Sequence, residues 1–255
     1  MTGRGRERAA RGAGRMVDRS AGDGAGTGPD VRVHVGVSEL VYVGPALGIR
    51  SHSTAVPRLL LALDEPFVLV GPAASTAPLR ALYVPARTRH AVATPGIRWL
   101  VVYLEPGSHR DRACRHRGIP DPDRLVHLAR TGRVRHLLDA IGPAGRPSSP
   151  TDEVITRMLR EPATRVSAAA MAASVGLSLA HFLRTFTEDT GTTFRLFGRW
   201  VRLLEATRLV SGRTLTETAT DAGFASPSHF SDTVRWAFGF TATELLATGV
   251  RIEPI

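Results

Sequence analysis

A pattern of small, glycine and aromatic residues occurs twice between residues 167 and 246. In the first copy, Ala172, Gly176 and Phe182 occupy positions that recur 47 or 48 residues later. The counterparts in the second copy are Ala219, Gly223 and Phe230. A constant offset of this length is typical of a duplicated supersecondary unit. This part of the chain is therefore restricted to two similar units in tandem.

Each copy is predicted to form a helix, a tight turn and a second helix. In the first copy, Ser167 is a suitable N-cap, and Gly176 can adopt the left-handed conformation in which many helices end. In the second copy Gly223 has the same role, and a serine followed by a proline suits the start of the next helix. We therefore expect two helix-turn-helix units, at residues 167–190 and 214–238.

These units resemble the paired helix-turn-helix domain of AraC/XylS-type bacterial transcription regulators. The resemblance extends over residues 166–210 and 214–246, and a match in two registers is far more specific than a single helix-turn-helix match. The matching residues are Gly176, Leu177, Ser178, Arg184, Phe186, Gly191, Arg202, Leu203, Ala206, Ala219, Gly223, Phe224, Ser226, Phe230 and Gly239. The resemblance implies a DNA-binding domain at residues 151–250.

The side of each second helix that remains exposed is the candidate DNA-reading face. With Phe182 and Phe186 buried, the opposite side of the first such helix lies near the N-terminal half that enters the major groove. A guanidinium group can bind guanine O6 and N7 together, so Arg184 is the foremost candidate; the alternative is a surface ion pair with Glu188. The candidate DNA-binding residues are Ala180, Leu183, Arg184 and Thr187 in the first unit and Ser228, His229, Asp232 and Arg235 in the second.

Charge is balanced over the proposed DNA-binding domain, although the whole chain carries a net charge of +10. Residues 150–255 hold 11 arginines and 11 acidic residues. Asp232 also departs from the family, in which a basic residue is frequent at this position; a carboxylate is repelled by phosphates but can accept a hydrogen bond from cytosine N4. Because phosphate neutralisation supplies most non-specific affinity, we expect weak non-specific binding unless the arginines gather on one face.

Short apolar runs interrupted by glycine and proline occupy residues 31–105. Runs such as VRVHV, RLLLAL and WLVVYL predict short strands, and several strands at this spacing favour a small barrel or sandwich. AraC-type regulators often carry a cupin-like barrel before the helix-turn-helix domain, so we expect an effector-sensing barrel at residues 30–105. The expected fold class is therefore α+β multidomain, a cupin-like β-barrel followed by an all-α domain with two helix-turn-helix subdomains.

The stretch PARTRH, which ends at His90, resembles the second cupin motif, with Arg87 in place of a glycine. The His-x-His of the first motif is missing after His52. Since a cupin metal needs about three imidazoles and a carboxylate, we expect His52 and His90 to line an effector pocket or the surface. Cys114 and its two neighbouring histidines lack the paired spacing of a structural zinc site. We expect no metal and no cofactor.

Residues 106–150 are expected to connect the two domains. The stretch 124–141 places apolar residues at largely helical spacing, with arginines between them. Two roles fit this stretch equally well: the dimer contact that helices after the barrel often make in this family, or packing on its own barrel. The turn-forming stretch GPAGRPSSP, at residues 142–150, is then a linker.

Residues 1–29 are rich in glycine and arginine and have little apolar periodicity, which predicts a disordered tail. The one cysteine excludes an intramolecular disulfide and fits a reducing compartment. The sequence contains neither an apolar run of about 18 residues nor the apolar core of a signal peptide. We therefore expect a cytoplasmic protein with no membrane partner.

Taken together, these patterns predict a sequence-specific DNA-binding transcription regulator controlled by an unidentified effector. Its expected partners are double-stranded DNA and, as the resemblance implies, RNA polymerase, a small-molecule effector and a second copy of the chain. We expect no enzymatic activity, because no Walker-type loop and no nucleophile elbow occur in the sequence. The alternative is a cupin-type metalloenzyme fused to a DNA-binding domain, which would contain stoichiometric metal.

The stretch between the two units, residues 194–212, predicts one long helix that holds the second helices about 34 Å apart, one turn of DNA. Leu204→Pro would remove a hydrogen bond inside this helix and kink it. We expect the substitution to abolish sequence-specific DNA binding, measured by fluorescence anisotropy, while Leu204→Met retains it. Full affinity in the proline variant would mean that a rigid connection is not required.

Overall fold

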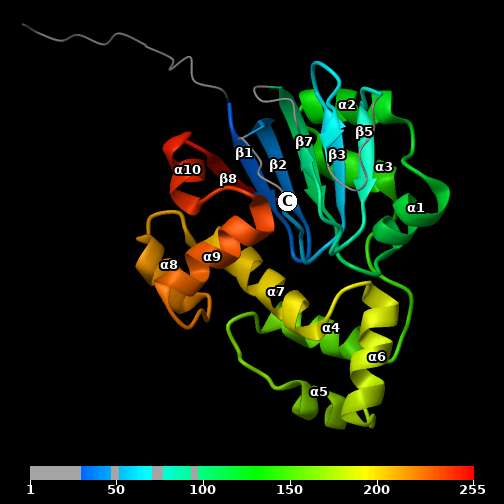
Figure 1. Cartoon of the computed structure of the whole chain (residues 1–255), viewed down its shortest axis with the longest axis vertical. Helices are drawn as coiled ribbons and strands as arrows, with labels where there is room; N and C mark the ends of the chain where they lie inside the picture. Colours follow the sequence, from blue (N-terminus) through cyan, green and yellow to red (C-terminus); the bar gives the residue numbers. More distant parts are fainter. Residues whose placement is uncertain (1–29, 47–51, 71–76, 93–96) are drawn as a thin grey trace, which may run out of the picture.

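The computed structural model describes residues 30–46, 52–70, 77–92 and 97–255, so the tail expected at residues 1–29 lies outside the described part (Figure 1). The strands are β1 (Arg32–Val35), β2 (Leu40–Pro45), β3 (Arg58–Ala62), β4 (Leu69–Val70), β5 (Ala81–Val84), β6 (Ala91–Val92), β7 (Arg98–Tyr103) and β8 (Arg251–Pro254). The helices are α1 (His109–Arg117), α2 (Pro122–Arg130), α3 (Val134–Ile141), α4 (Asp152–Arg160), α5 (Ala168–Ser174), α6 (Leu179–Thr190), α7 (Phe194–Leu209), α8 (Leu215–Asp221), α9 (Pro227–Phe238) and α10 (Ala242–Ala247). Within these residues, no single helix has both the length and the apolar composition of a membrane span.

The N-terminal domain is built on a six-stranded sheet with the order β5-β3-β7-β2-β1-β8, and β4 pairs separately with β6. Neighbouring strands are antiparallel except β1 and β8, which are parallel. The described strands leave β5 and β8 as two free edges, so the sheet is open and the expected closed barrel is not confirmed. The architecture is thus an N-terminal β-sheet domain followed by a helical domain.

Strand β8 follows the entire helical domain in the sequence but belongs to the N-terminal sheet (Figure 1). Its backbone is anchored at both ends, by hydrogen bonds from Arg251 N to Val31 O (2.9 Å) and from Ile255 N to Val35 O (3.1 Å). The side chain of Arg251 also forms an ion pair with Asp30. The segment therefore ties the helical domain to the outermost N-terminal strand and covers its free edge.

The two faces of the sheet contact different helices, because successive side chains of a strand point to opposite sides. On β7, Leu100 and Val102 pack with α1, α2 and α3, whereas Val101 and Tyr103 face the helical domain. The buried apolar residues of α2 and α3 are Leu125, Leu128, Val134, Leu137, Leu138 and Ile141. Of the two roles expected for residues 124–141, the structure shows packing on the chain's own sheet, and these side chains are not exposed for a dimer contact.

Aromatic rings form much of the contact between the sheet and the helical domain. The ring of Tyr103 stacks on Trp200 of α7, with centroids 5.4 Å apart, and meets the edge of Phe238 of α9 at 5.3 Å. Tyr42 of β2 lies 6.2 Å from Phe240. Such ring pairs stabilise a contact by about 0.5–1.5 kcal/mol beyond the area they bury. The orientation of α7 and α9 is therefore set by side chains of the N-terminal sheet.

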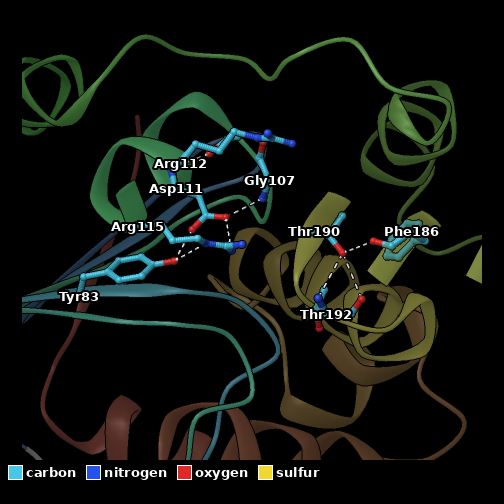
Figure 2. Close-up of polar contacts among 9 residues, drawn as sticks. Tyr83, Gly107, Asp111, Arg112, Arg115, Phe186, Thr190 and Thr192 are labelled. Atoms are coloured by element: carbon cyan, nitrogen blue, oxygen red, sulfur yellow. Dashed lines mark hydrogen bonds and ion pairs between the residues drawn. The ribbon is translucent and has the colours of Figure 1, made fainter. Parts of the chain in front are cut away.

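A second junction joins α1 to the sheet and to the end of α6. The buried carboxylate of Asp111 accepts hydrogen bonds from Tyr83 Oη (2.5 Å), Gly107 N (2.7 Å) and Arg115 Nη2 (3.0 Å) (Figure 2). These bonds fix the turn before α1. At Gly107, this turn lies close to the carbonyl group of Asp189, near the C-terminus of α6. The connecting helices thus contact the first helix-turn-helix unit as well as the sheet.

Gly107 is expected to be essential for this junction. Its φ is +77°, and a Cβ atom there would lie 2.5 Å from Asp189 O. We expect Gly107→Ala to lower the free energy of unfolding by about 1 kcal/mol for the left-handed conformation and about 1–3 kcal/mol more for the overlap. Urea denaturation measures this loss. Gly212→Ala is the matched control, because its φ is +76° and no atom of the described residues lies within 4 Å of the added Cβ. Equal losses in the two variants would contradict a tight contact at Gly107.

Candidate nucleic-acid interface

The first helix-turn-helix unit is formed by α5 and α6, and its local signals are those expected from the sequence. The hydroxyl groups of Ser167 and Ser178 accept hydrogen bonds from Ala170 N (3.1 Å) and His181 N (3.3 Å), which caps both helices. Gly176 in the turn between them has a φ of +69°. The serine caps and the glycine therefore fix where α6 begins, and with it the side chains of its first turns.

One side of α6 is buried and the opposite side is open to solvent. Phe182 and Phe186 are fully buried and contact the ring of Phe194 at 5.5 and 5.6 Å. The predicted DNA-reading residues Ala180, Leu183 and Arg184 are exposed, and Thr187 is half-buried with its hydroxyl donating to Leu183 O (2.9 Å). The buried phenylalanines thus leave the predicted reading face free to contact a ligand.

Arg184 also has the alternative partner expected from the sequence. Its Nε lies 4.0 Å from Glu188 Oε1, and the two side chains are 69% and 68% exposed. An ion pair this long and this exposed contributes little to stability, so the guanidinium can leave it at small cost when another acceptor approaches.

The second unit, α8 and α9, repeats this construction. Thr214 and Glu217 form a capping box at α8, and Gly223 in the turn has a φ of +77°. Ser226 caps α9, with Pro227 in its first turn. Phe230 and Val234 are buried, whereas the predicted residues Ser228, Asp232 and Arg235 are exposed. Asp232 makes no ion pair within the described residues.

His229 differs from the other predicted residues because it is half-buried. Its ring lies 5.5 Å from the ring of Phe224, and its Nδ1 has no hydrogen-bond partner within the described residues. Burial lowers the pKa of His229, and four guanidinium groups lower it further. They belong to Arg199, Arg202, Arg165 and Arg195, in order of effect. The structure therefore gathers arginines that are spread along the sequence, at the start of the second recognition helix.

Helix α7 connects the two units as one continuous helix, as expected from the sequence. Its 16 residues correspond to a length of about 24 Å. Phe197, Val201 and Leu204 are buried on one side. Near the last turn, Arg208 Nη2 donates to Val37 O of the N-terminal domain (2.9 Å). The helix between the two reading helices is thus also held by the sheet domain.

In the N-terminal domain, the structure brings His52 and His90 together. Their backbones exchange two hydrogen bonds (3.1 and 3.0 Å), and their ring centroids are 5.0 Å apart. The sequence did not suggest Arg58, which is fully buried and whose Nη1 lies 3.0 Å from His52 Nε2. Because the guanidinium donates this hydrogen bond, the nitrogen that faces it is not free to ligate a cation. Within the described residues, no three His, Cys, Asp or Glu side chains form a group that could hold a metal.

The motif that resembles a cupin sequence has an unusual backbone at its variant position. Arg87 has a φ of +65°, in the left-handed region that favours glycine. The position at which this chain departs from the cupin motif is therefore one where the fold still adopts a glycine-like conformation.

Comparisons with known proteins agree with this geometry. A family model described as "Helix-turn-helix domain" matches residues 171–248. An apo variant of ToxT from Vibrio cholerae is 12% identical, with 83% of this chain and 97% of that chain covered and a TM-score of 0.55. The DNA-binding domain of the global transcriptional factor AdpA, in complex with a target DNA, is 28% identical over 39% of this chain and 93% of that chain, with a TM-score of 0.37. An AraC-type regulator from Chromobacterium violaceum is 27% identical over 38% of this chain and 89% of that chain, with a TM-score of 0.36. No curated protein sequence matches the chain.

The two capped units, each with one exposed side on its second helix, define a helix-turn-helix domain of the DNA-binding class. Residues 171–248 are, more specifically, an AraC-type helix-turn-helix domain. The likeness to ToxT extends the shared fold to most of the chain, including the N-terminal sheet.

Stability is expected to depend on pH through His90. Burial, followed by the charge of Arg58, lowers the pKa of His90 to about 4. An unfolded histidine has a pKa of about 6.5, so the unfolded chain binds the proton more tightly. The contribution of the neutral ring is fully present above pH 6.5 and is lost as the pH falls toward 4, by about 3 kcal/mol in total.

Urea denaturation at pH 7 and pH 4.5 measures this effect. We expect His90→Gln to lose less stability than the wild type over this range, because carboxylates that titrate in the same window are common to both proteins. Equal losses would show that His90 does not titrate as its surroundings indicate.

Proposed function

We propose that this protein is a DNA-binding transcription regulator that reads two neighbouring major-groove segments with α6 and α9. One observation carries the proposal. In both units, serine caps and buried apolar residues fix the recognition helix so that its remaining side is exposed. Base readout needs side chains held in this way, since a recognition helix contacts base edges through its N-terminal part. A bacterial regulator of this kind acts on chromosomal DNA in the cytoplasm.

We propose that the eight residues predicted from the sequence make different kinds of contact with DNA. Arg184 reads a guanine, while Ala180 and Leu183 contact thymine methyl groups. In the second unit, Asp232 accepts from a cytosine amino group, and Ser228 and Arg235 contact the backbone or bases beside it. Thr187 and His229 have a smaller part, because the hydroxyl of Thr187 is already bonded within α6 and the ring of His229 packs on Phe224.

Control by an effector is proposed to act through the N-terminal sheet. The buried cluster of Arg58, His52 and His90 is rich in donors, and Arg58 Nε and Nη2 have no acceptor within the described residues. A buried guanidinium without a carboxylate partner is costly, so an effector with an anionic group would stabilise the state in which it binds. The cluster reaches the DNA-binding domain through Tyr103, whose ring lies 5.6 Å from Arg58 Cζ and stacks on Trp200. An effector regulates only if it binds two arrangements of the domains unequally.

The chemistry of this cluster speaks against the alternative of a cupin-type metalloenzyme, because a guanidinium faces the nitrogen that would ligate the metal. Contact with RNA polymerase follows from the resemblance alone. A homodimer, if formed, would need a surface other than the buried apolar side of α2 and α3.

Binding to DNA upstream of the protein's own and neighbouring genes tests the proposal, by fluorescence anisotropy with excess competitor DNA. The wild type is expected to prefer its site by about 10³-fold or more. Arg184→Ala should lose about 1–3 kcal/mol of specific affinity and leave non-specific affinity nearly unchanged.

Glu188→Gln is the matched control for this substitution. It removes the ion-pair partner and keeps the guanidinium, so it should retain or raise specific affinity. If Arg184→Ala discriminates as well as the wild type does, α6 does not read bases through this residue.

A further inference from the structure

A pocket of about 220 Å³ opens in the helical domain between α4, the start of α5 and α7. Its floor is apolar and includes Met158, Met171, Phe194 and Val201. Its polar lining, here called the rim, includes Arg157, Arg165, Arg195 and Arg202, together with Thr164 and one acidic residue, Glu161. Neither the reading faces of α6 and α9 nor the buried cluster around Arg58 includes this pocket, whose rim carries an excess of positive charge.

The arginines of the rim have no carboxylate partners. Within the described residues, none of them forms an ion pair, and neither does Arg199 on the same helix as Arg195 and Arg202. Most acidic residues of the helical domain are bonded elsewhere. The engaged ones include Asp152 with Arg146, Asp189 with Thr151, Glu205 with Arg208, Asp221 with Arg213, and Glu217 and Glu244 in capping boxes. Residues 150–255 thus hold equal numbers of arginines and acidic residues, but the two kinds lie in different places. The arginines at this pocket have no ion-pair partner within the described residues.

Arg202 has a ring contact but no anionic partner within the described residues. Its side chain is half-buried, its Cζ lies 5.8 Å from the ring centroid of Phe224, and its Nε has no hydrogen-bond partner within the described residues. Burial lowers the pKa of Arg202, and the charges of Arg165 and Arg199 lower it further. A buried guanidinium beside like charges is unfavourable until an anion joins it.

The pocket lies beside the first helix-turn-helix unit, and one of its arginines also contacts the second unit. Its wall includes Val166 and Ala168 at the start of α5, in the first unit. On the other side, Arg165 Nη2 donates to Gly223 O (3.3 Å) in the turn of the second unit. The charges of Arg165, Arg195 and Arg202 also lower the pKa of His229 in the first turn of α9. In helix-turn-helix proteins the first helix crosses the DNA backbone, so a cation cluster at this position is near the path of phosphates.

We propose that the arginine-lined pocket between α4, α5 and α7 binds a phosphate group. Guanidinium groups bind phosphate oxygens at two points, and a set of them suits its multiple charges. The phosphate has two sources: the DNA backbone between the two reading helices, or a free phosphorylated small molecule whose apolar part contacts Met158 and Phe194. The first source rests on the proposed DNA binding, whereas the second does not.

The DNA source is tested with Arg165→Gln/Arg195→Gln, which changes two exposed residues and should leave the fold intact, as urea denaturation verifies. We expect affinity to fall for all DNA sequences alike, and the slope of log K against log salt concentration to become shallower by about 1 for each arginine. Arg124→Gln, on exposed surface of α2, is the control and should leave the slope unchanged. This result differs from the loss of preference for the specific site that is expected for Arg184→Ala. Failure of the phosphate-site proposal can therefore be distinguished from failure of the proposed function.

The free ligand is tested without DNA, with pyrophosphate as the probe. Ligands that bind only the folded state raise the melting temperature. A rise in the wild type and the control that is absent in Arg165→Gln/Arg195→Gln, with an unchanged salt slope, would identify a small phosphorylated ligand. A reduced slope identifies the DNA backbone. If the double variant changes neither the slope nor the response to pyrophosphate, the pocket is not a phosphate site. Should the wild type bind no DNA, the pyrophosphate measurement alone decides.

Discussion

The parallel pairing of β8 with β1 determines how the two parts of this protein can move. The strand places the end of the helical domain on the outer edge of the N-terminal sheet, where its backbone bonds to Val31 and Val35. The aromatic contact of Tyr103 with Trp200 and Phe238 then fixes α7 and α9 on the sheet face beside it. Because these contacts use backbone bonds and buried rings, the sheet and the reading helices are a mechanically continuous body in this state.

This continuity limits how the proposed effector control can act. Any effector that changes the spacing or the tilt of α6 and α9 has to weaken a specific set of contacts between the domains: β8 on β1, Tyr103 on Trp200, or Arg208 on the Val37 carbonyl. The buried Arg58 cluster adjoins one of them, since its guanidinium lies over the ring of Tyr103. The arginine-lined pocket lies on the side of α7 away from Trp200. The charges of the pocket and the packing of the sheet therefore act on the same helix.

The helix-turn-helix units were predictable from sequence because their signals are local. The serine caps at Ser167 and Ser226 and the glycines at 176 and 223 act on their nearest neighbours, and all occur in the structure as expected. The strands of residues 31–105 were also recognisable, but the barrel predicted from them is not confirmed, because pairing at the edges of a sheet depends on distant segments. Strand β8 has only four residues, of which two are charged and one is proline, so its pattern is too short to predict a strand. The proximity of Arg165 to Arg195, Arg199 and Arg202 could not be predicted either, because the number of charges in a sequence does not say where they lie in the fold. The roles of the eight reading residues stay predictions.

The place of β8 also has a consequence for how the chain is made. A ribosome completes β1 to β7 well before it has synthesised β8, and N-terminal parts of a chain generally begin to fold first. Until the helical domain has been made, the sheet therefore exposes the edge of β1, where unpaired backbone groups invite pairing with another chain. Folding of the DNA-binding domain is then coupled to completion of the sheet. A chain that lacks β8 ends its sheet with β1, whereas the finished chain ends it with β8, whose two charged residues and proline are typical of a protected edge.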